Sequence, residues 1–551
     1  MRPPRLRGRA LVAARTAAET PATAALLAGV LKKSLGLEKL GALSAEVRGA
    51  LPVDMLVLRA KRERALPADD LPVAKHKVWP RTAASLAESL ASSSVLAETL
   101  AARAHQAAKT LADNRVMNVL VCDDPERTRR EAAESAARFK SGRPIGPLDG
   151  IPYLVKDELD VAGLPTRCGS LCESTEPRPA DATVVARLRA AGAVFVGKTV
   201  MTEWGMSPLG QNPHFKMPHN AHHAERLPGG SSSGSAVGVA LGVTPLAIGT
   251  DGGGSVRIPA SLNGVFGIKP TSGRVSRAGD PSESTVVHVG PIAASPHDLA
   301  LFLDAVASAP DARDPLTAHA EPPPPGGFGS RLRAGVKKLR IGVPESEWAD
   351  AAPGVAHAGQ QALAALEKEG AELVPVAMPV AKVAAPIGYL TIGCEALACH
   401  RGDWESRRHL FGDDLRLSFA VLDGISASDF LDAQRLRAAL RREAASVLSG
   451  VDLIALPTTQ TAAPELAVTD RGQAFADTAA IDAMCRFSFL GNLTGLPAGT
   501  APVGLDDGLP VGLQLVGDAW DEAIVLGALA HLERIEIARV VRPKAALDLL
   551  G

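Results

Sequence analysis

The stretch GTDGGGSVRIP at residues 249–259 places one serine directly after three consecutive glycines. Glycine has no Cβ, so a turn of this kind can bring several backbone N–H groups close to one point. Acyl transfer needs such groups, because a serine attacks a carbonyl while the N–H groups stabilise the oxyanion that forms. We therefore interpret Ser255 as a nucleophile and the N–H groups of Gly252, Gly253, Gly254 and Ser255 as its oxyanion hole.

Other interpretations of this glycine-rich region fit less well. A second cluster, PGGSSSGSAVG, lies at residues 228–238, and the segment between the clusters, ALGVTPLAIG, is apolar and typical of a strand, which a flexible linker would not enclose. Neither cluster contains the glycine-lysine-serine or glycine-lysine-threonine ending of a P-loop. The strand–turn–helix order of a GxSxG nucleophile elbow is also missing.

A serine nucleophile needs a base, and no histidine is obviously placed for that task. The histidines at 214, 219, 222 and 223 group in a loop-like stretch, where we expect them to be structural or solvated. Cysteines and a histidine that could in principle bind a metal occur at Cys168, Cys172, Cys394, Cys399 and His400. Their spacing matches no common zinc pattern, so we expect no metal site there.

The elements around these clusters alternate between helices and strands, which predicts an α/β sheet with helices on both faces. We expect one long helix from Thr82 to about Asn114, and another that is capped by Asp124, begins at Pro125 and ends before Gly142. A further helix is expected from Asp181 to Gly192. Strands are expected at residues 150–159, 193–197, 244–251, 264–270, 337–344, 451–459 and 508–517.

From about residue 80 to the end, the chain resembles the amidase signature family of serine hydrolases. The motifs that carry the resemblance are GPLDGIPYLVKDEL (146–159) and PGGSSSGSAVGVALGVTPLAIGTDGGGSVRIPASLNGVFGIKPT (228–271). The resemblance implies a large twisted mixed β-sheet sandwiched between helices. It also implies a catalytic domain at residues 79–551, preceded by an N-terminal helical extension at residues 1–78.

The resemblance implies a Ser–cisSer–Lys triad in which Lys156, in the VKD segment, takes a proton through Ser231 from the nucleophile Ser255. Lys156 and Ser231 are 75 residues apart, and Ser231 and Ser255 are 24 apart, as the family pattern leads one to expect. A cis peptide bond before Ser231 is part of this pattern. Burial disfavours the charged form of a lysine, which would let its amine accept the proton.

The remaining site residues are expected to support the triad. Ser232 and Asp251 would hold the network in place, and Arg257 would brace the loop instead of binding substrate. Met206 is a candidate to line an acyl pocket, with plain core packing as the alternative. We expect Lys198 and Lys269 to be ordinary solvated lysines. No metal or organic cofactor is required for this chemistry.

Within the family, several segments resemble the plant-type fatty acid amide hydrolases, among them ESTVVHVGPIAAS (283–295), RLSFAVLDGISASDFLDAQRLR (416–437) and GLPVGLQLVG (508–517). We therefore expect hydrolysis of N-acyl amides, including fatty acid amides, to a carboxylic acid and an amine. The alternatives are a small-molecule or aryl-acylamide amidase, a glutaminase like the catalytic subunit of glutamyl-tRNA amidotransferase, and a catalytically dead scaffold.

Bulk properties limit the partners. The net charge is −1, which gives no sign of a general nucleic-acid binder, so we expect a small-molecule amide substrate. Six cysteines in 551 residues indicate a reducing compartment, and we expect a cytoplasmic protein. A peripheral membrane contact through residues 1–78 and a homodimer both remain open.

Overall fold

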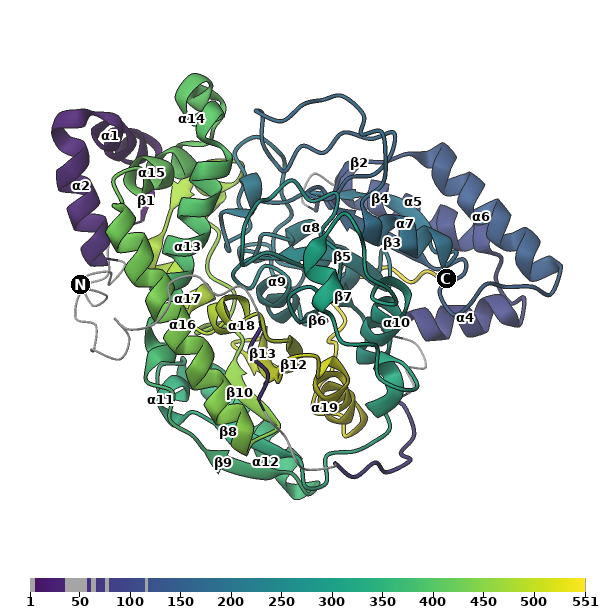
Figure 1. Cartoon of the computed structure of the whole chain (residues 1–551). Coiled ribbons are helices and arrows are strands. Elements are labelled where there is room, and N and C mark those ends of the chain that lie inside the picture. Colours follow the sequence, from purple (N-terminus) through teal and green to yellow (C-terminus); the bar gives the residue numbers. More distant parts are fainter. Residues whose placement is uncertain (1–4, 35–56, 61–65, 75–78, 114–116, 551) are drawn as a thin grey trace.

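The computed structural model describes residues 5–34, 57–60, 66–74, 79–113 and 117–550. Within these residues, eleven strands form one sheet in the order β2-β4-β3-β5-β7-β6-β12-β13-β10-β8-β9 (Figure 1). Their bounds are β2 Leu120–Cys122, β3 Pro152–Lys156, β4 Val194–Thr199, β5 Leu246–Asp251, β6 Phe266–Lys269, β7 His288–Ala293, β8 Arg340–Val343, β9 Glu372–Pro375, β10 Leu453–Pro457, β12 Ala498–Asp506 and β13 Leu509–Gly517. The α/β class and the mixed sheet are confirmed.

A hydrophobic core lies on each face of this sheet. Along β10, Leu453 and Ala455 belong to one core, whereas Ile454 and Leu456 belong to the other, as the alternation of side chains along a strand requires. Helices α12 (Pro353–Lys368) and α19 (Glu522–Arg534) contribute to the first core. Helices α13 (Ala384–Cys399), α16 (Ala427–Gly450) and α18 (Phe489–Thr494) contribute to the second.

The pairing of β3 sets the position of the site. This strand pairs in parallel with both β4 and β5. The carboxyl ends of parallel neighbours lie at the same edge of a sheet, so Lys156 at the end of β3 comes close to Thr250 and Asp251 at the end of β5. Helix α8 (Ser233–Ala240) lies between β4 and β5 in the sequence and packs against β3 and β5. The serine-rich cluster that precedes α8 therefore lies at this edge as well.

The prediction of one helix at residues 82–114 is wrong in one respect, because the structure has two helices there. They are α4 (Ala83–Ala91) and α5 (Ala97–Asp113), and Ser93 between them has a φ of 56°. Serine side chains compete for backbone hydrogen bonds, and here Ser94 Oγ donates to the carbonyl of Ser89. The alanine- and leucine-rich pattern on both sides hid this break.

The other two helices fit the sequence closely. Helix α6 (Pro125–Lys140) begins after Asp124, whose carboxylate accepts a hydrogen bond from the N–H of Arg127. Helix α7 spans Thr183–Ala190, so it begins two residues after the expected Asp181. Asp181 instead accepts a hydrogen bond from the N–H of Ala162.

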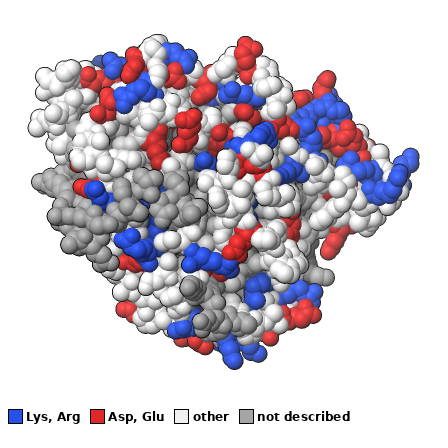
Figure 2. Space-filling model, in the orientation of Figure 1, with Lys and Arg blue, Asp and Glu red and all other residues white. Residues whose placement is uncertain are grey.

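The described residues of the N-terminal extension form helices between residues 8 and 34, whereas residues 57–60 and 66–74 form none. Helix α1 (Gly8–Glu19) packs against α15 (Asp413–Leu422), and α2 (Pro21–Ser34) follows it. Leu26 and Val30 on α2 are exposed, and Figure 2 shows few charges over this part of the molecule. Much of the extension lies outside the described residues, so its boundary at residue 78, its membrane contact and a homodimer stay predictions.

Among the described residues, one apolar segment is long enough to cross a membrane by length and composition alone. It spans Val380–Cys399, and half of it is buried inside the fold. Its helix α13 packs against α16 and α18, and Ile387 and Leu390 belong to the second core. Core packing therefore accounts for its apolar composition.

Candidate active site

Lys156 lies at the centre of a polar cluster with no solvent exposure. Its Nζ donates to Ser231 Oγ at 2.7 Å and to Thr250 Oγ1 at 2.6 Å. It also lies 2.8 Å from a carboxylate oxygen of Glu158, to which the Thr250 hydroxyl donates in turn. The structure thus brings together the expected Lys156 and Ser231, and adds Glu158 and Thr250, which the sequence motifs did not single out.

Ser231 is held between the two glycine-rich clusters. The peptide bond between Gly230 and Ser231 is cis, as the resemblance implies. The next residue, Ser232, joins the clusters, because its N–H donates to the carbonyl of Ser255 at 3.3 Å and its hydroxyl to the carbonyl of Thr250 at 3.2 Å. Ser232 thus connects its own glycine-rich cluster with the second one through two hydrogen bonds.

Ser255 lies between β5 and α9 (Arg257–Leu262), with only 8% of its surface exposed. Ser255, Ser231 and Gly252 line the same cleft. Among the hydrogen bonds of the described residues, none joins the hydroxyls of Ser231 and Ser255. Catalytic hydrogen bonds are often long in a site without substrate and tighten when substrate binds.

The glycine turn, residues 252–254, differs from its expected role at Gly254. The N–H of Gly254 donates to Asp251 Oδ1 at 2.7 Å, so it is already occupied. Within the described part of the chain, the N–H groups of Gly252, Gly253 and Ser255 have no hydrogen-bond acceptor. A glycine is required at position 254 for a different reason. Its φ is 116°, which favours glycine, and a Cβ there would lie 2.6 Å from Ser488 and Ile258.

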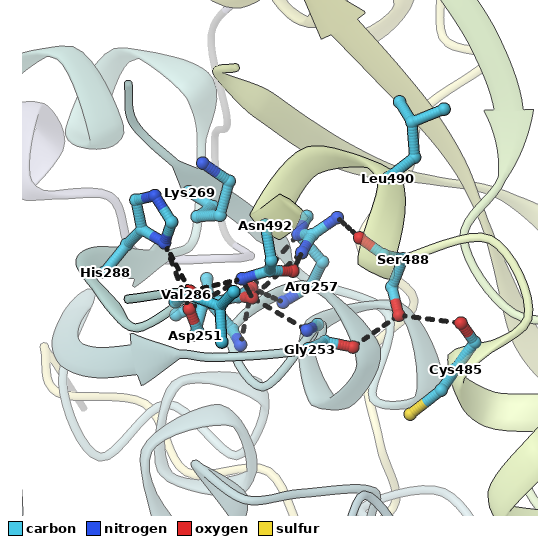
Figure 3. A network of polar contacts seen from close by, with 12 residues as sticks. Asp251, Gly253, Arg257, Lys269, Val286, His288, Cys485, Ser488, Leu490 and Asn492 are labelled. Carbon is cyan, nitrogen blue, oxygen red and sulfur yellow. Dashed lines mark hydrogen bonds and ion pairs between the residues drawn. The ribbon is translucent and has the colours of Figure 1, made fainter. Parts of the chain in front are cut away.

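Asp251 and Arg257 form a buried ion pair behind this turn (Figure 3). Burial by itself would raise the pKa of the Asp251 carboxyl, but Arg257 and Asn492 outweigh it and hold that pKa well below its usual range. Arg257 also donates to the carbonyl of Ser488 at 2.9 Å and contacts the side chain of Gln514. Arg257 braces the loop, as expected, and it does not line the cleft.

One wall of the cleft is aromatic and apolar. Trp204 and His400 stack with their ring centres 3.6 Å apart and their planes at 5°. Burial lowers the pKa of His400 to about 4, so its ring is neutral at pH 7. Met206 lines the cleft and also packs against a hydrophobic core, and Val287 and Ile392 lie in the same lining.

The charged residues that line the cleft are all acidic. Among the described residues of the lining, these are Glu158, Glu283 and Glu395, and none of these lining residues is a lysine or an arginine. Glu395 accepts hydrogen bonds from Ser284 Oγ and from the N–H and Oγ1 of Thr285. Glu283 is exposed. A negatively charged substrate group would meet no lysine or arginine partner in this lining.

The expectation for Lys198 and Lys269 is wrong, because neither side chain is exposed. Lys198 Nζ lies 2.7 Å from Asp157 Oδ1 and donates to the carbonyl of Pro165 and to Thr166 Oγ1. Lys269 Nζ donates to the carbonyl of Pro270, and burial together with Arg257 holds the pKa of Lys269 well below its usual range. A lysine near the end of a strand looks solvated in the sequence, but β4 and β6 each have a neighbouring strand on both sides, and both lysines are buried.

Two of the grouped histidines contact backbone carbonyls, and none of the four is among the described residues that line the cleft. His222 Nε2 contacts the carbonyl of Asn263 at 3.0 Å, and His219 Nδ1 contacts that of Asn220 at 2.9 Å. Burial lowers the pKa of both rings, which keeps them neutral at pH 7. Among the described residues, no three His, Cys, Asp or Glu side chains form a group that could hold a metal ion.

Comparison with known proteins places this geometry in a family. The family model for amidases matches residues 98–526. The chain belongs to the amidase family. It is 36% identical over 440 residues to a fatty acid amide hydrolase of Medicago truncatula, covering 79% of this chain and 72% of that protein. It is 35% identical over 449 residues to one subunit of the glutamyl-tRNA(Gln) amidotransferase of Chloroflexus aggregans, covering 77% of this chain and 90% of that protein.

A solved structure agrees with this placement. The peptide amidase of Stenotrophomonas maltophilia superposes with a TM-score of 0.69 at 29% identity, covering 85% of this chain and 99% of that one. The amidase signature fold and an amide-hydrolysing enzyme are thus shown. Relatives of nearly equal identity carry different names, so the degree of identity does not select a substrate.

Proposed function

We propose that the chain hydrolyses carboxamides through an acyl-enzyme on Ser255, with Ser231 and Lys156 as the proton relay. The observation that supports this most directly is the 2.7 Å contact between Lys156 Nζ and Ser231 Oγ, directly beneath a cleft that Ser231 and Ser255 both line. A buried amine bonded to a hydroxyl beside a nucleophile fits the pairing of a base with a serine.

In the proposed reaction, Ser255 Oγ attacks the amide carbon while its proton passes to Ser231 Oγ, whose own proton passes to Lys156 Nζ. The oxyanion lies among the N–H groups of Gly252, Gly253 and Ser255. The proton then returns through the same relay to the leaving nitrogen, and the C–N bond breaks. Water, activated by the same relay, hydrolyses the acyl-enzyme and releases the carboxylic acid.

The proposed substrates are N-acyl amides, including fatty acid amides, with no negative charge near the scissile bond. The apolar wall of Trp204, Met206 and Ile392 supports an acyl group, and the acidic lining disfavours an anion. Free glutamine carries an α-carboxylate, which would face Glu158, Glu283 or Glu395, while Lys156 beneath the cleft already pairs with Glu158 and does not line the cleft. This lining therefore speaks against the glutaminase alternative.

One observation favours a second candidate, the hydrolysis of short or aryl amides. The free volume of the cleft is about 40 Å³, far below the several hundred that enclose a drug-sized ligand. The flat stack of Trp204 and His400 would suit a planar ring. A long acyl chain would have to displace side chains such as Met206 or Ile392.

A substrate panel separates these candidates. N-acylethanolamines of increasing chain length, short primary amides, anilides and glutamine would be assayed with one enzyme preparation. We expect turnover of uncharged amides and none of glutamine. A rate that rises with acyl length selects fatty amides, and a rate highest for anilides selects aryl amides. Fast glutamine hydrolysis would overturn the argument from the acidic lining.

The nucleophile is tested separately with a serine-directed fluorophosphonate. Mass spectrometry should locate the adduct on Ser255, and Ser255→Ala should lose both the adduct and turnover. Ser261 offers a matched control, because it is a buried serine on the following helix that does not line the cleft. Ser261→Ala should keep labelling and turnover. An adduct on another residue would overturn the assignment.

A further inference from the structure

The glycine turn cannot hold its own shape. Glycine adopts positive and negative φ about equally well, so the peptide planes of a Gly-Gly-Gly segment can reorient at little cost. An oxyanion hole, however, works only when its donors already point at the place where charge develops. The direction of the N–H groups at residues 252–255 must therefore be fixed by other parts of the chain.

One peptide plane of the turn is held at both ends. The plane between Gly253 and Gly254 donates its N–H to Asp251 Oδ1 and accepts at the Gly253 carbonyl from Ser488 Oγ (Figure 3). Because a peptide unit is planar, two bonds on opposite sides remove its freedom to rotate. The following plane is held as well, since the N–H of Ile258 donates to the Gly254 carbonyl at 2.7 Å.

The segment that contains Ser488 also holds Asp251, the residue before the glycine turn. Asn492, one helical turn after Ser488, donates from Nδ2 to the Asp251 carbonyl at 2.8 Å and to Asp251 Oδ1 at 2.9 Å. The Asp251 carbonyl belongs to the peptide plane whose N–H is that of Gly252. Phe489 packs directly on the turn, since a Cβ on Gly253 would lie 2.5 Å from its ring.

We propose that Ser488 and Asn492 are positioning residues that clamp the glycine turn. Ser488 does so from the residue before α18, and Asn492 from within this helix. The clamp rests on the proposed function, because it orients the donors that the proposed reaction uses. The two side chains lie more than 230 residues from the turn in the sequence and are almost fully buried. Neither lines the cleft, so they act through the backbone and not on the substrate.

The clamp has a specific kinetic consequence. The oxyanion exists only during the reaction, so misdirected N–H groups weaken the transition state without weakening substrate binding. Loss of a whole oxyanion donor costs about 100- to 1,000-fold in kcat in a well-studied serine protease. Partial misalignment should cost less.

The experiment compares side-chain deletions in α18 and at the residue before it. Ser488→Ala removes the bond to the Gly253 carbonyl, and we expect kcat to fall about tenfold with KM within twofold. Asn492→Ala should lower kcat about 100-fold. The matched control is Thr494→Val, because the Thr494 hydroxyl is also buried but donates to Leu490 in the same helix and not to the turn. Its kcat should change less than twofold.

A second readout separates positioning from folding. A trifluoromethyl ketone that carries the best acyl group forms an oxyanion with Ser255, so its affinity should fall in Ser488→Ala by the same factor as kcat/KM. Melting temperature should change equally in Ser488→Ala and Thr494→Val. If Ser488→Ala does not fold, Ser488→Cys keeps the size of the side chain with a weaker donor and should show the same loss.

The outcomes are distinguishable. Unchanged kcat in both Ser488→Ala and Asn492→Ala would overturn the clamp, as would an equal loss in Thr494→Val. If the wild-type enzyme neither turns over amides nor takes a phosphonate on Ser255, the proposed function itself fails. If the wild type is active and only the variants at 488 and 492 lose kcat, both proposals stand.

Discussion

Two buried lysines lie at the ends of neighbouring parallel strands, and each pairs with a carboxylate from the same short stretch, VKDEL. Lys156 lies 2.8 Å from Glu158, and Lys198 lies 2.7 Å from Asp157. Neither lysine is exposed. Each also donates to a threonine hydroxyl, Lys156 to Thr250 and Lys198 to Thr166.

The difference between them lies in the remaining partner. Lys156 donates to Ser231, which lines the cleft, whereas Lys198 donates to the carbonyl of Pro165. A carbonyl oxygen has no proton to give, but a hydroxyl can pass one on. Burial and a carboxylate partner therefore do not distinguish the two lysines, whereas the hydroxyl that faces the cleft does, and it is the reason for proposing Lys156 as the catalytic one.

The largest expected effect breaks the comparison at Lys156. Lys156→Ala should lower kcat about 1,000- to 10,000-fold, because Ser231 loses the base that takes its proton. The measurement is the hydrolysis of an amide and its matched ester. The loss should be larger for the amide if Lys156 also protonates the poorer leaving group. Equal losses would contradict that second role.

The next effect concerns stability and not rate. Lys198→Met should lower the free energy of unfolding by about 3–5 kcal/mol, because it leaves the Asp157 carboxylate buried without its cation. Burial already raises the pKa of Asp157 despite Lys198. Urea denaturation gives the measurement, and the double variant with Asp157→Asn should recover part of the loss. A large fall in kcat with unchanged stability would remove the distinction between the two lysines.

A carboxyl group buried without any lysine sharpens the comparison. Burial raises the pKa of Asp298 to about 7, and within the described residues its Oδ2 has no hydrogen-bond partner. Between about pH 4 and 7 the unfolded carboxyl loses its proton while the folded one keeps it, so stability falls as the pH rises. Asp298→Asn should reduce this fall by about 2–4 kcal/mol, measured by urea denaturation at pH 4, 6 and 8. If the free energy of unfolding depends on pH equally in Asp298→Asn and in the wild type, Asp298 is not the source of the fall.

The smallest effect compares the two threonines. Thr250→Val removes the hydroxyl that connects Lys156 with Glu158, and kcat should fall about tenfold. Thr166→Val removes the equivalent hydroxyl beside Lys198, so kcat should change less than twofold while the free energy of unfolding falls by about 1 kcal/mol. Steady-state kinetics and urea denaturation of both variants give the answer. Similar kinetics in the two variants would show that the hydroxyl beside Lys156 has no special role.

Much of the site could be predicted because its residues lie in short contiguous motifs. Ser255 and its glycines occur in one stretch, and the resemblance supplied Lys156 and Ser231 through fixed spacings. Most strands were also predictable, since buried strands form apolar runs. Glu158 and Thr250 lie within the same motifs, two residues after Lys156 and one before Asp251, so their positions in the chain offer a signal for them as well.

Other residues gave no such signal. Ser488 and Asn492 lie in an ordinary apolar segment, and nothing in FSFLGNLTG marks them as partners of a turn more than 230 residues earlier. Lys198 and Lys269 were expected to be solvated because strand ends are often exposed, but neighbouring elements cover both. Gly254 was expected to donate to the oxyanion, and only the folded turn shows that Asp251 takes its N–H.

The sequence by itself determined the family and the α/β class, and it proposed Lys156, Ser231 and Ser255 as the site residues, because these depend on local residue patterns and fixed spacings. Only the tertiary structure decided which buried lysine faces a hydroxyl in the cleft, which glycine N–H groups stay free, and which charges line the cleft. These properties depend on contacts between segments far apart in the chain, such as β3 with β5 and α18 with the glycine turn. Such contacts form only when packing of the sheet and its helices closes the loops between them.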